Sequence, residues 1–192
     1  MTGLLRDSEG ATLVEFALVV PLFLVLLLGI MDAGQMVYGK SVLNGAVHRA
    51  ARLSALETRN TSEADAQVLA TVRPVLPGVK LTSTRTSYYD FADVGRSEKW
   101  NDQNGNSRCD NNETYTDENH NGQWDQDIGK QNDEGSANDV VVYRVEAKFD
   151  PLFKVPFLPS FWAERKLVAT AVTKNQPFGV QSSLGSSAGS CP

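Results

Sequence analysis

The sequence predicts an α+β protein in which one long N-terminal helix, embedded in a membrane at its start, packs on a small antiparallel sheet. Three observations support this prediction. An apolar run covers residues 11–31, three later segments alternate apolar and polar residues, and an acidic, Asn-rich repeat lies between two of those segments. The repeat contains too few apolar residues to form a core, which predicts an insertion in the head of the protein.

The apolar run, ATLVEFALVVPLFLVLLLGIM, has the length of a membrane-spanning helix. Its 21 residues rise about 31 Å as an α-helix, which matches the hydrocarbon core of a bilayer. A secretory signal peptide has a shorter apolar core and a small-residue cleavage site, and Gly29-Ile30-Met31-Asp32 is a poor one. The sequence therefore predicts a single transmembrane helix over residues 11–31, slightly bent at Pro21.

The helix is expected to continue outside the membrane, because apolar residues recur at helical spacings after Asp32. These residues are Met36, Leu43, Val47 and Ala50. Glycines and alanines in the same stretch either allow close helix packing or only lower helix stability, and the sequence leaves both open. A second short helix is predicted at 62–73, capped by Thr61 or Ser62 and ending before Pro74.

Three segments alternate like half-buried strands. They cover residues 79–89, 140–149 and 164–173. Packed on the extended helix, they complete a head made of residues 32–97 and 136–175. The Pro- and Phe-rich stretch 151–162 is expected to be a loop that covers the core, with a membrane-surface contact or a subunit interface as alternatives. Residues 176–192 are rich in Gly and Ser and are expected to be disordered.

Acidic charge is concentrated in one segment of the chain. Residues 98–139 carry eleven acidic and three basic side chains, a net of −8 in a chain of −5, so the remainder is about +3. This local excess favours a cation site over a generally acidic surface. No basic patch with interleaved aromatic residues occurs, so nucleic acid is not expected as a partner. With only His48 and His120 as histidines, and no catalytic arrangement of side chains, an enzyme is not expected.

The acidic segment, residues 98–135, contains two copies of one pattern, fifteen residues apart. Each copy places oxygen-bearing groups at the positions that EF-hand-type loops use to bind calcium: 1, 3, 5, 7 (through the backbone carbonyl), 9 and 12. The first loop offers Asp102, Asn104, Asn106, Arg108, Asp110 and Glu113; the second offers Asp117, Asn119, Asn121, Gln123 and Asp125. The sequence therefore predicts one or two bound calcium ions as the protein's cofactor.

Each loop departs from the calcium-binding pattern in one place. Gly122 is the glycine expected at position 6 of the second loop, whereas the first loop has Ser107 there. The twelfth residue of the second loop is Ile128, so closure of that loop requires another carboxylate: Asp127, Asp133 or Glu134. Asn ligands carry less charge than Asp, which predicts a weak affinity suited to extracellular calcium. The alternative is a solvated acidic insertion without metal.

Aromatic residues and one cysteine accompany the two loops. Trp100 and Tyr115 precede the loops, and Trp124 occupies position 8 of the second, which predicts a small aromatic core shared by both. Position 8 of the first loop is Cys109. The other cysteine of the chain, Cys191, lies in the Gly/Ser-rich tail, and the sequence does not decide whether the two pair.

Residues 6–56 resemble the N-terminus of TadE-like minor pilins, which are pseudopilins of the tight-adherence (Flp) pilus. The most specific element is Gly10 followed by ATLVEF. It is similar to the prepilin-peptidase site of that family: a glycine, four residues, a glutamate and an aromatic residue. The resemblance implies a leader of residues 1–10, which a membrane aspartyl protease removes by cutting between Gly10 and Ala11. Glu15 and Phe16 then become the fifth and sixth residues of the mature chain.

The resemblance also implies a function and a location. It predicts a structural or assembly subunit of an adhesive pilus, single-pass in the cytoplasmic membrane, with its head outside the cytoplasm. The implied partners are the membrane, the prepilin peptidase and other pilin subunits, which it contacts through the N-terminal helix. The alternative, from another class, is a membrane-anchored calcium-dependent adhesion or sensing module that is not incorporated into a filament.

Glu15 is the one carboxylate inside the apolar run. A carboxylate in lipid needs a cationic partner, and the amino group that cleavage creates on Ala11 of a neighbouring subunit is the expected one. The alternative is that Glu15 marks the membrane edge, which leaves a short span of about 24 Å from Phe16 to Met31.

Overall fold

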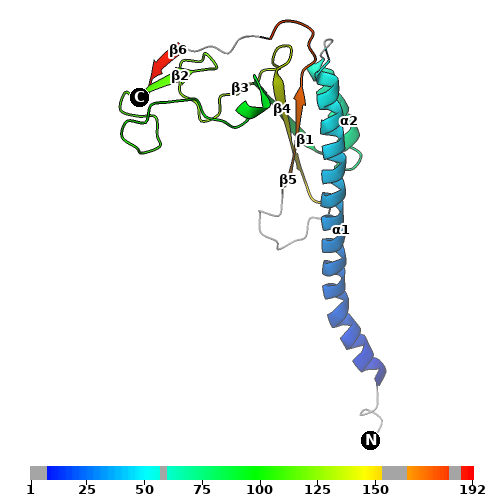
Figure 1. The fold of residues 1–192 in the computed structure, drawn as a ribbon. Helices are drawn as coiled ribbons and strands as arrows, with labels where there is room; N and C mark the ends of the chain where they lie inside the picture. Colours follow the sequence, from blue (N-terminus) through cyan, green and yellow to red (C-terminus); the bar gives the residue numbers. More distant parts are fainter. Residues whose placement is uncertain (1–7, 57–59, 153–163, 182–186) are drawn as a thin grey trace, which may run out of the picture.

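The computed structural model describes residues 8–56, 60–152, 164–181 and 187–192, and it has the predicted α+β architecture (Figure 1). The elements in chain order are α1 (Ser8–Ser54), α2 (Thr61–Val72), β1 (Lys80–Tyr88), the 3-10 helix η1 (Phe91–Asp93), β2 (Thr114–Asp117), β3 (Lys130–Gln131), β4 (Val140–Phe149), β5 (Arg165–Lys174) and β6 (Ser187–Ser190). The head gathers at one end of α1, and the other end of this helix extends away from it.

Helix α1 is continuous from the apolar run into the head. It passes through Pro21, and its residues 12–31 are long and apolar enough to cross a membrane while contacting almost nothing else in the protein. Beyond this exposed part, Leu43, Val47 and Ala50 are buried, as their spacing predicted. Gly39 packs on Leu76, because a Cβ there would lie 2.8 Å from the Leu76 side chain. At this position the small residue permits close packing.

The main sheet is antiparallel with strand order β3-β1-β4-β5. The three long strands are the three that alternation predicted, and each starts and ends within one residue of its expected range. Alternate residues of β4 and β5 face α1 and α2, and they form the core with the buried faces of those helices. Since strand side chains alternate between faces, this arrangement leaves the polar residues of the same strands on the opposite, exposed face.

Buried polar contacts fix the two helices to the sheet. Asp65 of α2 accepts hydrogen bonds from Arg85 (2.6 Å), Ser83 (2.7 Å) and the Tyr143 hydroxyl. Burial by itself would raise the pKa of Asp65, but these three donors outweigh it and hold the pKa below 3.8. At the membrane side of the head, Arg165 of β5 forms an ion pair with Asp32 of α1 at 2.6 Å. The sheet is therefore held close to the end of the apolar segment.

Three expectations need correction or stay outside the described residues. The tail is not wholly disordered, because β6 pairs with β2 in a second, two-stranded antiparallel sheet. Its composition gave no strand signal, since the pairing depends on a distant part of the chain. Helix α2 is capped by Asn60, whose side chain accepts from the Glu63 N–H at 3.1 Å, and not by Thr61 or Ser62. Most of the predicted loop 151–162 lies outside the described residues.

Candidate functional site: the two-loop module

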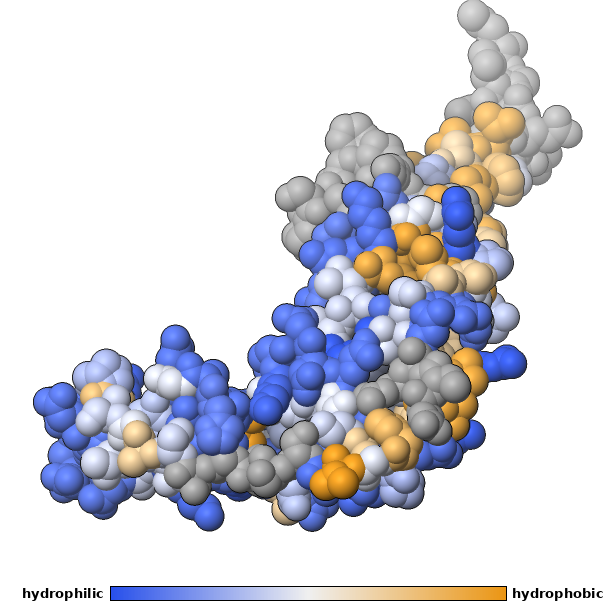
Figure 2. Space-filling view, turned by 90° about the horizontal axis from the view of Figure 1, so that it is seen from above, coloured by the Kyte–Doolittle hydropathy of each residue, from blue (hydrophilic) through white to orange (hydrophobic). Residues whose placement is uncertain are grey.

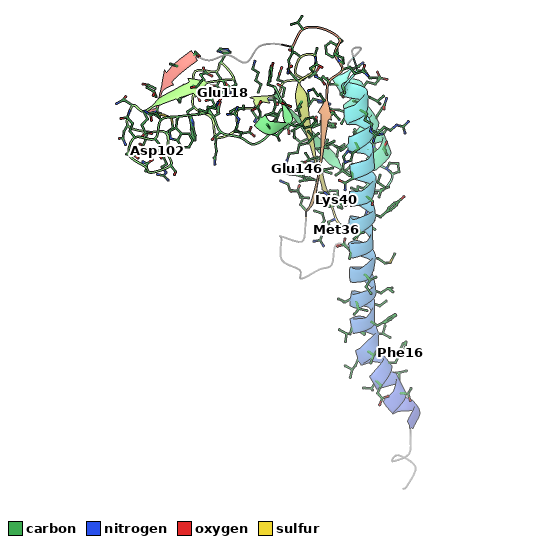
Figure 3. All side chains as sticks on the ribbon, in the orientation of Figure 1. Phe16, Met36, Lys40, Asp102, Glu118 and Glu146 are labelled. Atoms are coloured by element: carbon green, nitrogen blue, oxygen red, sulfur yellow. A yellow bond between two sulfur atoms is a disulfide. The ribbon has the colours of Figure 1, made fainter. Side chains whose placement is uncertain are left out.

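The two acidic loops form a separate lobe, here called the two-loop module and defined as residues 98–128 together with β6. It leaves the head between β1 and β4, as predicted, and extends away from α1 (Figures 1 and 3). Hydrophilic residues cover almost all of its visible surface in the view of Figure 2, whereas apolar residues gather along α1. Among the described residues, the main apolar core of the head contains no residue of the module.

Arg96 joins the module to the head. Its guanidinium donates to Glu118 (2.7 Å) in the module and to Asp93 (2.9 Å) in η1. The Arg96 hydrogen bonds lower the pKa of Glu118. Nearby, Ile128 packs with Tyr88 and Val140 in a second, small apolar cluster.

The two sequence repeats pair with each other across their aromatic residues. Trp100 and Tyr115, which occupy the same position in the two repeats, form an antiparallel bridge. On either side of it, the Asn101 N–H donates to the Thr114 carbonyl and the Thr116 N–H to the Lys99 carbonyl, both at 2.8 Å. The rings of Trp100 and Trp124 meet edge to face, with centroids 5.1 Å apart, and Tyr115 is buried. The predicted aromatic core shared by both loops is confirmed.

The first loop is organised by side chains at its odd positions. Asp102 at position 1 accepts backbone N–H donors from Gly105, Asn106 and Ser107 at 2.7–3.1 Å. The side-chain amides of Asn104 and Asn106, at positions 3 and 5, both converge on the Asp110 carboxylate at position 9. These hydrogen bonds join residues that are up to six positions apart in sequence.

The second loop repeats this organisation residue by residue. Asp117 at position 1 accepts N–H donors from Asn121 (3.2 Å) and Gly122 (2.8 Å). The amides of Asn119 and Asn121 both donate to Asp125 at position 9. At this position, as at Asp110, the carboxylate is the point on which two amides converge.

Side chains alone do not complete a metal site in the described residues. No group of three or more His, Cys, Asp and Glu side chains is placed there to hold an ion. In each loop two Asn amide groups contact the position 9 carboxylate, and they do so through nitrogen. Rotation of these amides would present their oxygens at the same place, since the two ends of an amide have the same shape. The predicted carbonyl ligands belong to Arg108 and Gln123, which occupy equivalent positions in the two loops.

One glutamate makes equivalent contacts in each loop, and the sequence did not point to the glutamate that contacts the second loop. In the first loop, Glu113 accepts the N–H of Gln103 at position 2 (2.9 Å) and of Asp110 at position 9 (3.5 Å). In the second loop, Glu98 accepts from the same two positions, the N–H groups of Glu118 (2.7 Å) and Asp125 (3.0 Å). Glu98 therefore has the position in loop two that Glu113 has in loop one.

The three carboxylates that the sequence offered for closure of loop two have other contacts. Asp127 accepts from the Tyr88 hydroxyl at 2.9 Å, Asp133 from Ser87, and Glu134 from Thr61 at 2.5 Å. In each of these three hydrogen bonds the donor belongs to the head. Counting loop positions forward from Asp117 could not find Glu98, because Glu98 precedes Asp117 in the chain. The pairing of the two repeats brings Glu98 to the second loop.

Glu98 is fully buried, with 0% of its surface exposed. Burial raises the pKa of this carboxyl group; the N–H donors of Glu118 and Asp125 oppose the effect, and the nearby Asp117 carboxylate adds to it. A buried acid beside other acids is a costly arrangement unless its charge is compensated.

Position 6 shows a further difference between the loops. Both Ser107 (φ 59°) and Gly122 (φ 77°) have left-handed backbone conformations. Only glycine adopts this conformation without steric cost. The left-handed conformation of Ser107 therefore destabilises the turn of the first loop relative to a glycine at the same position.

Replacing Ser107 with glycine is therefore expected to stabilise the first loop by about 1 kcal/mol, the usual cost of a left-handed non-glycine residue. The reciprocal change, Gly122→Ser, should destabilise the second loop by a similar amount. Amide hydrogen exchange of the two loops measures both effects, and each variant serves as the control for the other. Slower exchange in the second loop of the Ser107→Gly variant would contradict this explanation.

The residues of the processing motif lie on α1, far from the module. Gly10 and Ala11 are in the first turns of this helix, and the Glu15 and Phe16 side chains are exposed, Phe16 at 69%. Within the described residues, the head does not cover this part of α1. Glu15 and Phe16 are accessible to a partner, and the motif lies apart from the loops.

A disulfide between Cys109 and Cys191 joins the first loop to the C-terminal segment. The sequence left this pairing undecided, and 82 residues separate the two cysteines. One sequence feature indicated a buried role for Cys109: it occupies position 8, where the second loop has the inward-facing Trp124.

The comparison with known proteins concerns the N-terminal helix. Residues 10–52 match the family model described as TadE-like protein. No curated protein and no solved structure matches the chain. The matched residues contain Gly10, Glu15 and Phe16 and the whole apolar run. The N-terminal helix is thus similar to the TadE-like family, which is associated with the tight-adherence pilus.

Proposed function

We propose that the protein is a minor pilin: a structural or assembly subunit of a tight-adherence pilus, anchored by α1 in the cytoplasmic membrane. The observation that carries this proposal is the family match over residues 10–52. The matched range includes the exposed apolar part of α1 and continues into the part that is buried in the head. An apolar helix that is exposed in this way needs lipid or other helices around it.

Processing by a prepilin peptidase fits the same helix. Cleavage between Gly10 and Ala11 would place a new amino group four residues before Glu15. In a filament of such helices, this group on one subunit pairs with the Glu15 carboxylate of its neighbour. The exposed position of Glu15 supports the proposal, since no group among the described residues of the head covers this carboxylate.

We further propose that the two-loop module binds calcium at both loops. The ligands at positions 1, 3, 5, 7 and 9 are those predicted from the sequence, and Glu113 and Glu98 supply the closing carboxylate of loops one and two. Support comes from the equivalent contacts of the two glutamates and from the buried position of Glu98. Bound cations would offset the −8 charge of residues 98–139, since Ca²⁺ prefers carboxylate and amide oxygens.

An extracytoplasmic head agrees with the Cys109–Cys191 disulfide. Disulfides persist in oxidising compartments and are rare in the cytosol. Free calcium is also sufficient outside the cytoplasm for the weak sites that Asn-rich loops form.

A second candidate function is a membrane-anchored, calcium-dependent adhesion or sensing module that is not part of a filament. The two-loop module favours it, because the module projects away from α1 and leaves its surface free for a ligand (Figure 1). Both candidates use the same calcium site. They differ in whether the N-terminus is processed.

Co-expression of the full chain with a prepilin peptidase separates the two candidates. Intact mass and N-terminal sequencing are expected to show a mature chain that begins at Ala11. A Gly10→Leu variant, which changes only the residue before the cut, should remain unprocessed and inserted in the membrane. A wild-type chain that the active peptidase leaves intact would reject the pilin proposal in favour of the adhesion or sensing module.

A further inference from the structure

The backbone carbonyl of the closing glutamate is held differently in the two loops. In loop two, the Trp124 indole N–H at position 8 donates to the Glu98 carbonyl at 3.2 Å. In loop one, position 8 is Cys109, which has no such donor. The Glu113 carbonyl instead accepts the backbone N–H of Cys191 at 2.8 Å. Because Cys191 is bonded to Cys109, the disulfide-linked segment takes the place of the tryptophan.

The C-terminal segment, residues 187–191, is built into the module. Strand β6 pairs with β2 over four residues, from Thr114↔Ser190 to Asp117↔Ser187. Gly189 lies against the Tyr115 ring so closely that a Cβ would be 2.2 Å from it. Cys191 is only 2% exposed. A two-stranded sheet of this length is marginal by itself in water, so the disulfide is what keeps the segment in place.

We propose that the C-terminal segment is a redox-dependent clasp that positions Glu113, so that the first loop is complete only when Cys109 and Cys191 are oxidised. This inference rests on the proposed calcium-binding function. The C-terminal segment contacts the first loop through the Cys109–Cys191 disulfide and through the hydrogen bond to the Glu113 carbonyl. Reduction removes the disulfide. In loop two Trp124 holds the equivalent Glu98 carbonyl, so this carbonyl does not depend on the bridge, and the C-terminal segment contacts loop two at Asp117.

The clasp closes by thiol–disulfide exchange with a protein disulfide of an extracytoplasmic oxidoreductase. One cysteine thiolate attacks the oxidant's disulfide and releases one oxidant thiol. The second cysteine then attacks the mixed disulfide and releases the other. The chain loses two electrons and two protons, and the oxidant gains them as two thiols. In the reducing cytosol the reaction does not proceed, so loop one stays open until the head is exported.

The test uses the full chain in detergent, with the two loops separated by substitution. In a Glu98→Gln background the intact loop is loop one, and in a Glu113→Gln background it is loop two. Adding Cys109→Ser and Cys191→Ser together is expected to weaken calcium binding at least about tenfold in the first background, as loss of an outer-shell partner does. In the second background the same pair of changes should weaken calcium binding by a clearly smaller factor, because Trp124 still holds the Glu98 carbonyl. Calorimetry measures both values.

Reduction of the wild type should reproduce the effect of the double cysteine change, and reoxidation should restore the original affinity. Limited trypsin digestion without calcium gives an independent readout, because Arg108 lies next to Cys109 and is exposed. Cleavage after Arg108 should accelerate several-fold on reduction, while cleavage after Lys130 should not.

The outcomes of the two experiments are distinct. Equal calcium affinity with and without the cysteines in the Glu98→Gln background would overturn the clasp and leave calcium binding intact. No calcium binding by the oxidised wild type would overturn the proposed metal site. The trypsin experiment then decides the clasp alone, and an unchanged rate at Arg108 after reduction would reject it.

Discussion

Replacing Glu98 with glutamine is expected to abolish calcium binding at the second loop while leaving the first loop intact. The carboxylate of Glu98 contacts positions 2 and 9 of that loop and is completely buried within the module. Glutamine keeps the size of the side chain but loses one negative charge and one of the two oxygens that would bind the cation. Loss of an outer-shell partner already costs 10–100-fold in metal affinity, so about 100-fold or more is expected here.

Glu113→Gln is the matched variant, because Glu113 makes the equivalent contacts in loop one. Calorimetry of the full chain should show two calcium ions in the wild type and one in each single variant. The double variant should bind none in the millimolar range. Each single change should preserve the head, whose core is separate from the module.

Asp127→Asn is the control for this experiment. By sequence position alone, Asp127 was a candidate to close the second loop, but its carboxylate accepts from the Tyr88 hydroxyl and the Gly129 N–H. Its substitution should therefore leave both calcium affinities unchanged. Two normal sites in the Glu98→Gln variant, or loss of the second site in Asp127→Asn, would show that the closing residue is assigned wrongly.

Local patterns were sufficient to predict most of the fold. Helical spacing located the buried residues Leu43, Val47 and Ala50 of α1, and alternation located β1, β4 and β5. These patterns succeed because the side chains of one helix or strand face a common core, so the signal is present within a few residues. The ligand candidates at positions 1 to 9 of each loop were also found locally.

The unpredicted features all depend on contacts between distant segments. Glu98 precedes Asp117 by nineteen residues, and it reaches the second loop only because the repeats pair around Trp100 and Tyr115. The Gly- and Ser-rich segment that contains β6 has no strand pattern, and its order depends on Tyr115 and on the disulfide. The fifteen-residue repeat did align Glu98 with Glu113. The repeat did not show which loop each glutamate contacts. Glu98 precedes loop one but contacts loop two, and Glu113 contacts loop one.

Replacing Glu15 with alanine is expected to prevent incorporation into the pilus without preventing membrane insertion. A carboxylate within the apolar span costs about 2.5–3.5 kcal/mol on insertion scales. Pairing with the Ala11 amino group of a neighbouring subunit would recover this energy only in the filament. In the Glu15→Ala variant this gain in free energy on assembly is lost, and the helix is more stable in lipid alone.

The expected loss corresponds to about 100-fold less subunit in sheared pili relative to the membrane fraction, the factor given by about 2.7 kcal/mol. Quantitative immunoblotting of the two fractions measures this ratio. Val14→Ala is the control, because Val14 is also exposed on α1 one residue away but carries no charge. Cleavage after Gly10 should be checked by mass in both variants. This separates a failure of assembly from a failure of processing. Normal incorporation of a correctly processed Glu15→Ala subunit would mean that Glu15 marks the membrane edge and has no partner in a filament.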